Sequence, residues 1–267
     1  MMTVNDVLKA LFDFAPKSLA LSYDNPGFLV GRGESEVKKI LVVLDITSAV
    51  IREAVDTGAN LIVSHHPVIF NGEKSITDAS VTGELVLSMA EAGISAICMH
   101  TNLDSARGGV NDILADLFGI ENAKPLDPIE DGTVGIGRYG EIGCAMELSE
   151  FLSVVCEKLS CGGVRYHDAG KTVKKLAVGG GSCGDFITVA KELGCDTIVT
   201  ADIKHNQFLD ARELSINAID AGHFATENIV SEKLCEVILE SFPDASVSIA
   251  KSNTDATAYF KISERKN

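Results

Sequence analysis

The stretch KKILVVLDITSAVIREAVDTGANLIVS, residues 38–64, decides the fold class. It begins with the apolar run 38–46, which is typical of a buried strand. Residues 47–57 follow with helical spacing and end at Gly58, and residues 59–64 form a second apolar run. A strand, a helix and a strand in this order are typical of a parallel sheet with helices on its faces.

The same order continues along the chain. A helix is predicted over 81–92, before Gly93, and a strand over 94–99. The second half repeats the order, with strand 174–178, helix 185–193, strand 195–200, helix 205–214 and strand 216–220. The sequence therefore predicts the α/β class, with two similar α/β domains whose sheets are mainly parallel.

The two halves also share residues at matching positions of their helix-to-strand joins. Ile51, Ala54, Gly58, Ile62 and Val63 match Ile187, Ala190, Gly194, Ile198 and Val199. Because the order of elements matches as well, the sequence indicates an internal duplication.

Residues 120–143 separate the two halves. This stretch, IENAKPLDPIEDGTVGIGRYGEIG, is rich in Gly and Pro, which is typical of a linker and a domain boundary. We expect a first α/β domain made of residues 1–126 plus 226–267, and a second α/β domain made of residues 127–225.

The composition is that of a globular protein. Of 267 residues, 46% are apolar and 23% are charged, and no apolar run approaches the about 18 residues that a membrane span needs. The formal net charge of −15, without a basic stripe, argues against a nucleic-acid partner. Seven cysteines without a C-x-x-C pair indicate reduced thiols, and the N-terminal segment differs from a signal peptide. We therefore expect a cytoplasmic enzyme or binding protein with no membrane partner.

Two histidines follow the predicted strand 59–64. His65 and His66 stand at its carboxyl end, where ligands bind in open α/β sheets. Successive residues of an extended strand point to opposite faces, and Pro67 keeps His66 extended. We therefore expect the two imidazoles to diverge and to serve two different ions. The alternative is a solvated turn.

Two His-x-x-x-carboxylate motifs lie just past other predicted strands. They are HTNLD, with His100 and Asp104, and HFATE, with His223 and Glu227. If each motif forms a helical turn, its two side chains share a face, because residues four apart are neighbours on a helix. The alternative is that each His caps a strand and each acid caps the next helix.

Together these motifs supply nitrogen and oxygen ligands but no thiolate. The set comprises His65, His66, His100, Asp104, His223 and Glu227. Such a set suits Zn, Mn, Fe, Co or Ni better than Ca. A divalent metal centre is therefore the leading hypothesis from the residues alone.

The glycine run 179–184, GGGSCG, follows the predicted strand 174–178 and fits the pattern G-x-G-x-x-G. Three interpretations are open. It forms a dinucleotide-binding turn with Asp202 as the ribose-binding acid, a tight turn for close backbone packing, or a phosphate cradle for a substrate. Cys183 within it is either a thiol with a lowered pKa or a buried inert thiol.

Three further residues are candidates for the cleft. Asp202 and His205 occupy the second-half counterpart of the His65-His66 pair, where they would contact substrate or transfer protons. Alternatively, Asp202 caps a helix and His205 is a surface residue. Asp24, in YDNPG, has a role in the cleft or belongs to a plain turn.

Four motifs, in their order along the chain, resemble the family of GTP cyclohydrolase 1 type 2 homologues, which is NGG-interacting-factor-like. They are YDNPG at 23–27, SHHP at 64–67, HTNLD at 100–104 and GHFATE at 222–227. The chain resembles the short form of the family, without the domain that longer members insert between the halves. Tyr23 stands where a Trp is usual, and Ala256 where a Pro is usual; neither belongs to the metal motifs.

The resemblance implies two divalent metal ions per chain, bound in the cleft between the two α/β domains. Carried over residue by residue, it implies that His66 and Asp104 bind one ion while His65 and His223 bind the other. Glu227 would bridge the pair.

His100 lies in the matching motif, and the resemblance leaves it as a direct ligand or as a residue that supports the ligands or transfers a proton; it is the candidate catalytic residue. The resemblance further implies that subunits assemble into a toroidal homohexamer. Two ions, offset by two carboxylates and a hydroxide, would leave a local charge of about +1, which attracts a small anionic substrate.

The function that follows is a metal-dependent hydrolase acting on a nucleotide or another phosphate-containing small molecule, GTP cyclohydrolase-like activity being one form. The alternative is a non-catalytic metal-dependent assembly or metal-handling protein.

Overall fold

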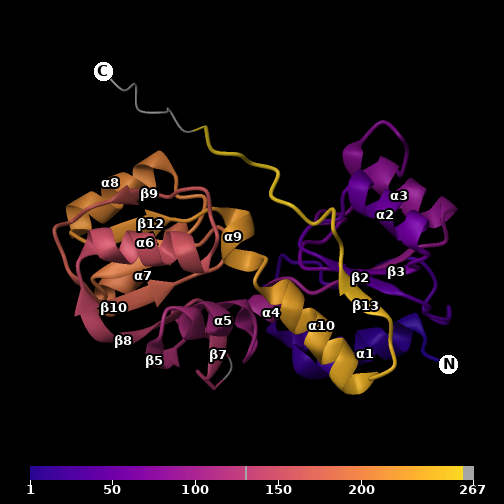
Figure 1. Ribbon diagram of the computed structural model, residues 1–267, viewed down its shortest axis with the longest axis horizontal. Coiled ribbons are helices and arrows are strands. Elements are labelled where there is room, and N and C mark those ends of the chain that lie inside the picture. Colours follow the sequence, from indigo (N-terminus) through magenta and orange to yellow (C-terminus); the bar gives the residue numbers. More distant parts are fainter. Residues whose placement is uncertain (130, 261–267) are drawn as a thin grey trace.

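The computed structural model describes residues 1–129 and 131–260 of the chain, whose strands form two main sheets and one small sheet (Figure 1). The first main sheet has the order β1 (Gly27–Val30), β4 (Ser95–Cys98), β3 (Leu61–Ser64), β2 (Ile40–Val43) and β13 (Val247–Ile249). The second has the order β5 (Ile120–Lys124), β8 (Arg138–Met146), β10 (Val173–Val178), β11 (Thr197–Thr200), β12 (Asn217–Asp220) and β9 (Arg165–His167). The small sheet pairs β6 (Asp127–Ile129) with β7 (Val134–Ile136).

The helices of the first half are α1 (Val4–Phe14), η1 (Lys17–Leu19), α2 (Ser48–Thr57), α3 (Val81–Glu91), α4 (Thr101–Ser105) and α5 (Val110–Leu117). Those that follow are α6 (Leu148–Lys158), η2 (Gly184–Phe186), α7 (Ile187–Glu192), α8 (His205–Leu214), α9 (His223–Glu227) and α10 (Val230–Ser241). Among the described residues, no helix has both the length and the apolar character that crossing a membrane requires.

The stretch that decides the fold class forms β2, α2 and β3, as predicted. α2 begins after Thr47, whose side chain accepts a hydrogen bond from the Val50 amide, and it ends at Gly58 in the left-handed conformation (φ 72°). Every residue of β2 and β3 is buried. This follows because the sheet has a core on each face: Val42 packs in the core that holds α1 and α10, and Val43 in the core that holds α2 and α3.

Parallel pairing joins β13, β2, β3 and β4 in the first sheet and β10, β11 and β12 in the second. Antiparallel strands extend both sheets: β1 pairs with β4, β8 with β10, β5 with β8, and β9 with β12. The predicted α/β class is confirmed, and the β-α-β-α-β order recurs in both halves.

The prediction of a linker over 120–143 is wrong for the described part of that stretch. It forms β5, β6, β7 and the first part of β8. Gly132 lies between β6 and β7 and Gly137 between β7 and β8, with positive φ values of 82° and 64°, whereas Gly135 (φ 145°) lies within β7. The glycines between these strands therefore mark turns and not a connection without structure.

The domain division into residues 1–126 plus 226–267 and residues 127–225 stays a prediction. β5, at Ile120–Lys124, pairs with β8 and so belongs to the second sheet. Residues 261–267, which the prediction assigns to the first domain, lie outside the described residues.

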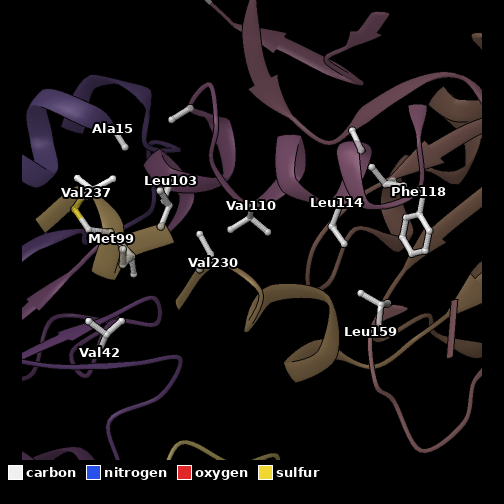
Figure 2. Packing of buried hydrophobic residues seen from close by; sticks show 14 of the residues in the cluster. Ala15, Val42, Met99, Leu103, Val110, Leu114, Phe118, Leu159, Val230 and Val237 are labelled. Carbon is white, nitrogen blue, oxygen red and sulfur yellow. The ribbon is translucent and has the colours of Figure 1, made fainter. Parts of the chain in front are cut away.

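One hydrophobic core connects the two sheets. It contains Val42 and Met99 of the first half as well as Val178 and Val199 of the second. Figure 2 shows Val110 lying between Leu103 on one side and Leu114 on the other, so the cluster continues through α4 and α5. Burial of this shared apolar surface holds the two halves in one arrangement.

Candidate metal centre

The candidate ligands of the first half follow the carboxyl ends of adjacent parallel strands. Val43 of β2, Ser64 of β3 and Cys98 of β4 are in register, so the residues that follow them gather at one edge of the sheet. His65 and His66 come directly after β3. His100 caps α4 just past β4, and Asp104 lies within that helix.

The ligands of the second half lie on α9, which with α4 stands between the two main sheets (Figure 1). The α9 helix begins three residues after β12, following Gly222 with φ 88°. His223 Nε2 lies 2.9 Å from Glu227 Oε2, as expected for residues four apart on a helix. Both predicted helical turns are confirmed.

His65 is fully buried and has a defined tautomer. Its Nδ1 lies 2.8 Å from the Met99 carbonyl oxygen. Because a carbonyl only accepts, Nδ1 carries the proton and Nε2 presents a lone pair. That lone pair faces Asp104 Oδ1 at 3.5 Å and Glu227 Oε2 at 3.7 Å.

Within the described residues, His65 Nε2 and Asp104 Oδ1 are buried without a hydrogen-bond partner. Two buried lone-pair donors facing each other are unfavourable unless a cation lies between them. The donor set therefore fits a divalent metal ion.

Nδ1 of each of the other three cluster histidines lies 2.7 Å from a carboxylate oxygen. The partners are Asp45 for His66, Asp24 for His100 and Asp202 for His223. A carboxylate at Nδ1 holds the proton there and turns Nε2 toward the centre, which is the usual support of metal-bound histidines. Four histidines are thus oriented to offer Nε2.

The expectation that His65 and His66 diverge is wrong. Their ring centroids are 5.0 Å apart, and both Nε2 atoms approach Glu227 Oε2, at 3.7 Å and 2.9 Å. The physical reason is that β3 ends at Ser64, so the pair lies in a bend and no longer follows the alternation of a strand.

Three groups of donor atoms could each hold a metal ion, with all atoms of a group within 4.8 Å of one another. They are His65, Asp104 and Glu227; His66, His223 and Glu227; and His65, His66 and His100. Two of these groups share Glu227. The pairing implied by the family resemblance differs, because the structure places His65 with Asp104 and His66 with His223.

Three side chains of the cluster have raised pKa values. The pKa of Asp104 is raised to about 7, mainly by burial; His65 opposes the rise, and the nearby Glu227 adds to it. Burial would lower the pKa values of His66 and His223, but hydrogen bonds to carboxylates raise them to about 10 and about 9. The carboxylates thus attract positive charge, which protons or metal ions can supply.

The cluster lies in a cavity of about 550 Å³. Its lining includes residues of both halves: Leu21, Tyr23, His66, Pro67, Phe70, His100, Thr101, Asp104, Asp127, Ile136, Gly180, Ser182, Cys183, Asp185, Phe186, His223 and Glu227. This volume is typical of small-molecule sites.

The comparisons with known proteins identify the family. The model described as Duf34/NIF3 (NGG1p interacting factor 3) matches residues 2–257. The chain belongs to the Duf34/NIF3 family.

The Duf34/NIF3 chain is 35% identical over 258 residues to a GTP cyclohydrolase 1 type 2 homolog from Clostridium perfringens, covering 95% of this chain and 98% of that one. A relative of the same name from Clostridium acetobutylicum is 33% identical over 261 residues, with 95% and 97% covered. The crystal structure of the Staphylococcus aureus hypothetical protein SA1388 has a TM-score of 0.90 at 29% identity, covering 97% of this chain and 99% of that chain. The resemblance drawn from the motifs is confirmed.

In this Duf34/NIF3 chain the glycine run 179–184 packs closely against the ligands. The Gly180 amide donates to Asn111 Oδ1 and the Gly181 amide to Thr226 Oγ1, both at 3.0 Å. These amides are already paired within the protein, so they are not free to bind the phosphate of a substrate. The pyrophosphate of a dinucleotide would need the same amides, so that interpretation is disfavoured as well. The structure favours the tight turn.

The structure also places three other candidates. His205 is exposed at the start of α8 and does not line the cavity formed by the described residues, so the surface interpretation holds. Asp202 contacts His223 and belongs to the centre. Cys183 is buried, and burial raises the pKa of its thiol, as expected for an inert cysteine.

Asp24 supports His100 at the cavity, whereas Asp45 is a residue of the centre that the sequence did not indicate. The Asp24 carboxylate is fully buried and accepts hydrogen bonds from the Thr101 amide and side chain as well as facing His100. The available signal for Asp45 was its position just past β2, at the same sheet edge as His65 and His66.

We expect Asp45→Asn and Asp202→Asn to lower metal affinity by about 10- to 100-fold. An amide can donate to Nδ1, which permits the tautomer with the proton on Nε2, and that tautomer cannot bind a metal through Nε2. Metal titration by calorimetry measures the effect. Asp78→Asn, at an exposed loop position, is the matched control and should bind as wild type. Unchanged affinity in both test variants would contradict the proposed role of these carboxylates.

Proposed function

We propose that this chain is a hydrolase that binds two divalent metal ions and acts on a nucleotide or another phosphate-containing small molecule. The observation that carries the proposal is Glu227. It belongs to two of the three ligand groups and is buried at the wall of a substrate-sized cavity. A buried carboxylate shared by two groups is suited to bridge two cations.

We assign the ligands of each ion from these two groups. His65 and Asp104 would hold one ion, His66 and His223 the other, and Glu227 would contact both. When bound, two divalent ions supply Lewis-acid activation of a water and of a phosphoryl or carbonyl oxygen. The donor set of nitrogen and oxygen suits Zn, Mn, Fe, Co or Ni.

His100 is the protein side chain that we expect to contact the substrate. Its Nδ1 faces Asp24 at 2.7 Å, so Nε2 is left to accept a hydrogen bond in the cavity. Asp24 is held in turn by Thr101, which fixes the direction of the imidazole. We propose that His100 orients the substrate or the attacking water. Its Nε2 would accept and hold a proton during the reaction.

The substrate class follows from charge and from the relatives. A centre with two dications attracts an anion despite the net charge of −15. The curated relatives carry the name GTP cyclohydrolase 1 type 2 homolog, so a guanine nucleotide is the first substrate to test. Metal-loaded wild type should turn over GTP or another nucleotide, and Glu227→Ala should abolish turnover without changing the oligomeric state. Failure of the wild type to turn over any nucleoside phosphate would count against the hydrolase.

A second candidate is a metal-dependent assembly without catalysis. It is favoured by the origin of the ligands, since His65 and His66 follow the first sheet and His223 follows the second. Metal would then stabilise the arrangement of the two halves. Loss of the ions would lower the melting temperature in both cases, but only the hydrolase shows turnover that depends on His100.

Two conservative variants separate the ligands from their support. Asp104→Asn should mainly weaken the ion held with His65, so about one ion per chain remains. His100→Gln should keep the stoichiometry near wild type and lower the affinity by about 10- to 100-fold. Elemental analysis and metal titration on both variants measure this. Equal loss of both ions in Asp104→Asn would contradict the division of ligands proposed above.

Self-assembly is a separate expectation, carried by the family resemblance. We expect a toroidal homohexamer, and sedimentation velocity at micromolar concentration measures the mass. A species of one chain only would contradict it.

A further inference from the structure

Two aromatic side chains stand exposed at the cavity that holds the candidate ligands. Tyr23 is 66% exposed and Phe70 is 42% exposed, and both line the cavity. Their ring centroids are 6.3 Å apart at an interplanar angle of 69°. Large aromatic side chains bury extensive surface in binding sites, so two exposed ones beside polar ligands need an explanation.

The two aromatic residues are fixed relative to the centre. The Phe70 ring lies edge-on to His100, with centroids 5.9 Å apart. The Asn25 side-chain amide donates to the Ile69 carbonyl at 2.7 Å, which ties the loop of Tyr23 to the loop of Phe70. Asp24, next to Tyr23 in the chain, holds His100. The aromatic pair and the centre are thus connected through short contacts.

The cavity lining combines two kinds of chemistry. The candidate metal ligands supply nitrogen and oxygen atoms, and the apolar side chains of Ile136 and Phe186 line the cavity as well as Tyr23 and Phe70. A ligand that uses both kinds of lining has an anionic group and a flat apolar ring.

We propose that Tyr23 and Phe70 form a platform on which the nucleobase of a nucleotide stacks, while its phosphate points to the metal centre. This inference rests on the proposed function and names the substrate class more closely. Stacking suits the pair because every base has a π-face and aromatic rings prefer offset or edge contacts. Tyr23 in addition carries a hydroxyl that can hydrogen-bond to a base edge.

The test measures binding and not turnover. Wild type loaded with metal is titrated by calorimetry with guanosine monophosphate, ribose 5-phosphate, inorganic phosphate and guanosine. We expect guanosine monophosphate to bind more tightly than ribose 5-phosphate. Tyr23→Ala and Phe70→Ala should lower the affinity for guanosine monophosphate by about 5- to 150-fold, which corresponds to the stacking of one base. The affinity for ribose 5-phosphate should stay unchanged.

Matched variants separate stacking from folding. Tyr23→Phe keeps the ring, so its affinity for guanosine monophosphate should stay within a few-fold of the wild-type affinity. Tyr166→Ala removes another exposed tyrosine, which does not line this cavity, and should have no effect. Elemental analysis should return unchanged metal content in every variant, since neither ring supplies a ligand atom.

The outcomes distinguish this inference from the proposed function. Equal affinity of wild type for guanosine monophosphate and ribose 5-phosphate, or no binding of either, overturns the platform. A platform effect seen with guanosine in metal-free protein, together with no metal-dependent turnover, supports the platform while overturning the hydrolase. Loss of metal in Phe70→Ala would assign Phe70 a structural role and overturn its place in the platform.

Discussion

Replacing Glu227 by Gln is expected to remove both metal ions from the chain together. The side chain keeps its size and its hydrogen bonding but loses the charge that, in the proposed centre, would offset two adjacent dications. Its Oε2 lies 2.9 Å from His66 Nε2, 2.9 Å from His223 Nε2 and 3.7 Å from His65 Nε2. The metal content measured by elemental analysis after reconstitution should therefore fall from the two ions per chain that we propose for wild type toward zero.

The control for this variant is Glu240→Gln, at an exposed position of α10, which should keep both ions. If Glu227 served only as a helix cap, Glu227→Gln would cost about 1 kcal/mol of stability and leave the metal content unchanged. Full occupancy with a small change in melting temperature would thus refute the bridging role and the hydrolytic mechanism that depends on it.

Gly181→Ala should lower the metal content about as much as Glu227→Gln, although it replaces no ligand residue. A Cβ atom at this position would lie 2.0 Å from Glu227 Oε1 and 3.0 Å from His223 Nε2. The loop cannot easily retreat, because the Gly181 amide is bonded to Thr226 and the Gly180 amide to Asn111. Glu227 must then leave its position, so we expect loss of most bound metal and a lower melting temperature.

Gly170→Ala is the matched control for the backbone. Gly170 has φ 66°, close to the 61° of Gly181, but no atom lies within 4 Å of its added Cβ. Both variants carry the left-handed strain of about 1–2 kcal/mol. Only Gly181→Ala adds the clash, so only it should lose metal. Similar metal content in the two variants would show that close approach of the loop to Glu227 is unimportant.

The sequence could predict the elements and most of the candidate ligands. The apolar runs and helix ends around Thr47 and Gly58 define β2, α2 and β3, because strand and helix periodicity and capping are local properties. The spacing of His223 and Glu227 likewise predicts a shared helix face, since neighbours four apart meet wherever the helix lies.

Local rules failed where the chain leaves regular structure. His65 and His66 were expected to diverge because the alternation of a strand was extended to them, but β3 ends at Ser64, directly before His65. The glycines of 120–143 were interpreted as a linker, because the same residue type serves hairpin turns and flexible segments. Neither case could be decided without knowing which backbone groups pair with which.

The sequence by itself determined the α/β class, the strand ends and the residue types available for a metal. Only the tertiary structure decided which of them meet. His66 and Glu227 are 161 positions apart, and Asp45, Asp24 and Asp202 orient the histidines from three separate loops. These meetings depend on how the two sheets pack around the shared core of Val42, Val110 and Val199, a sum of many weak contacts that no local pattern contains.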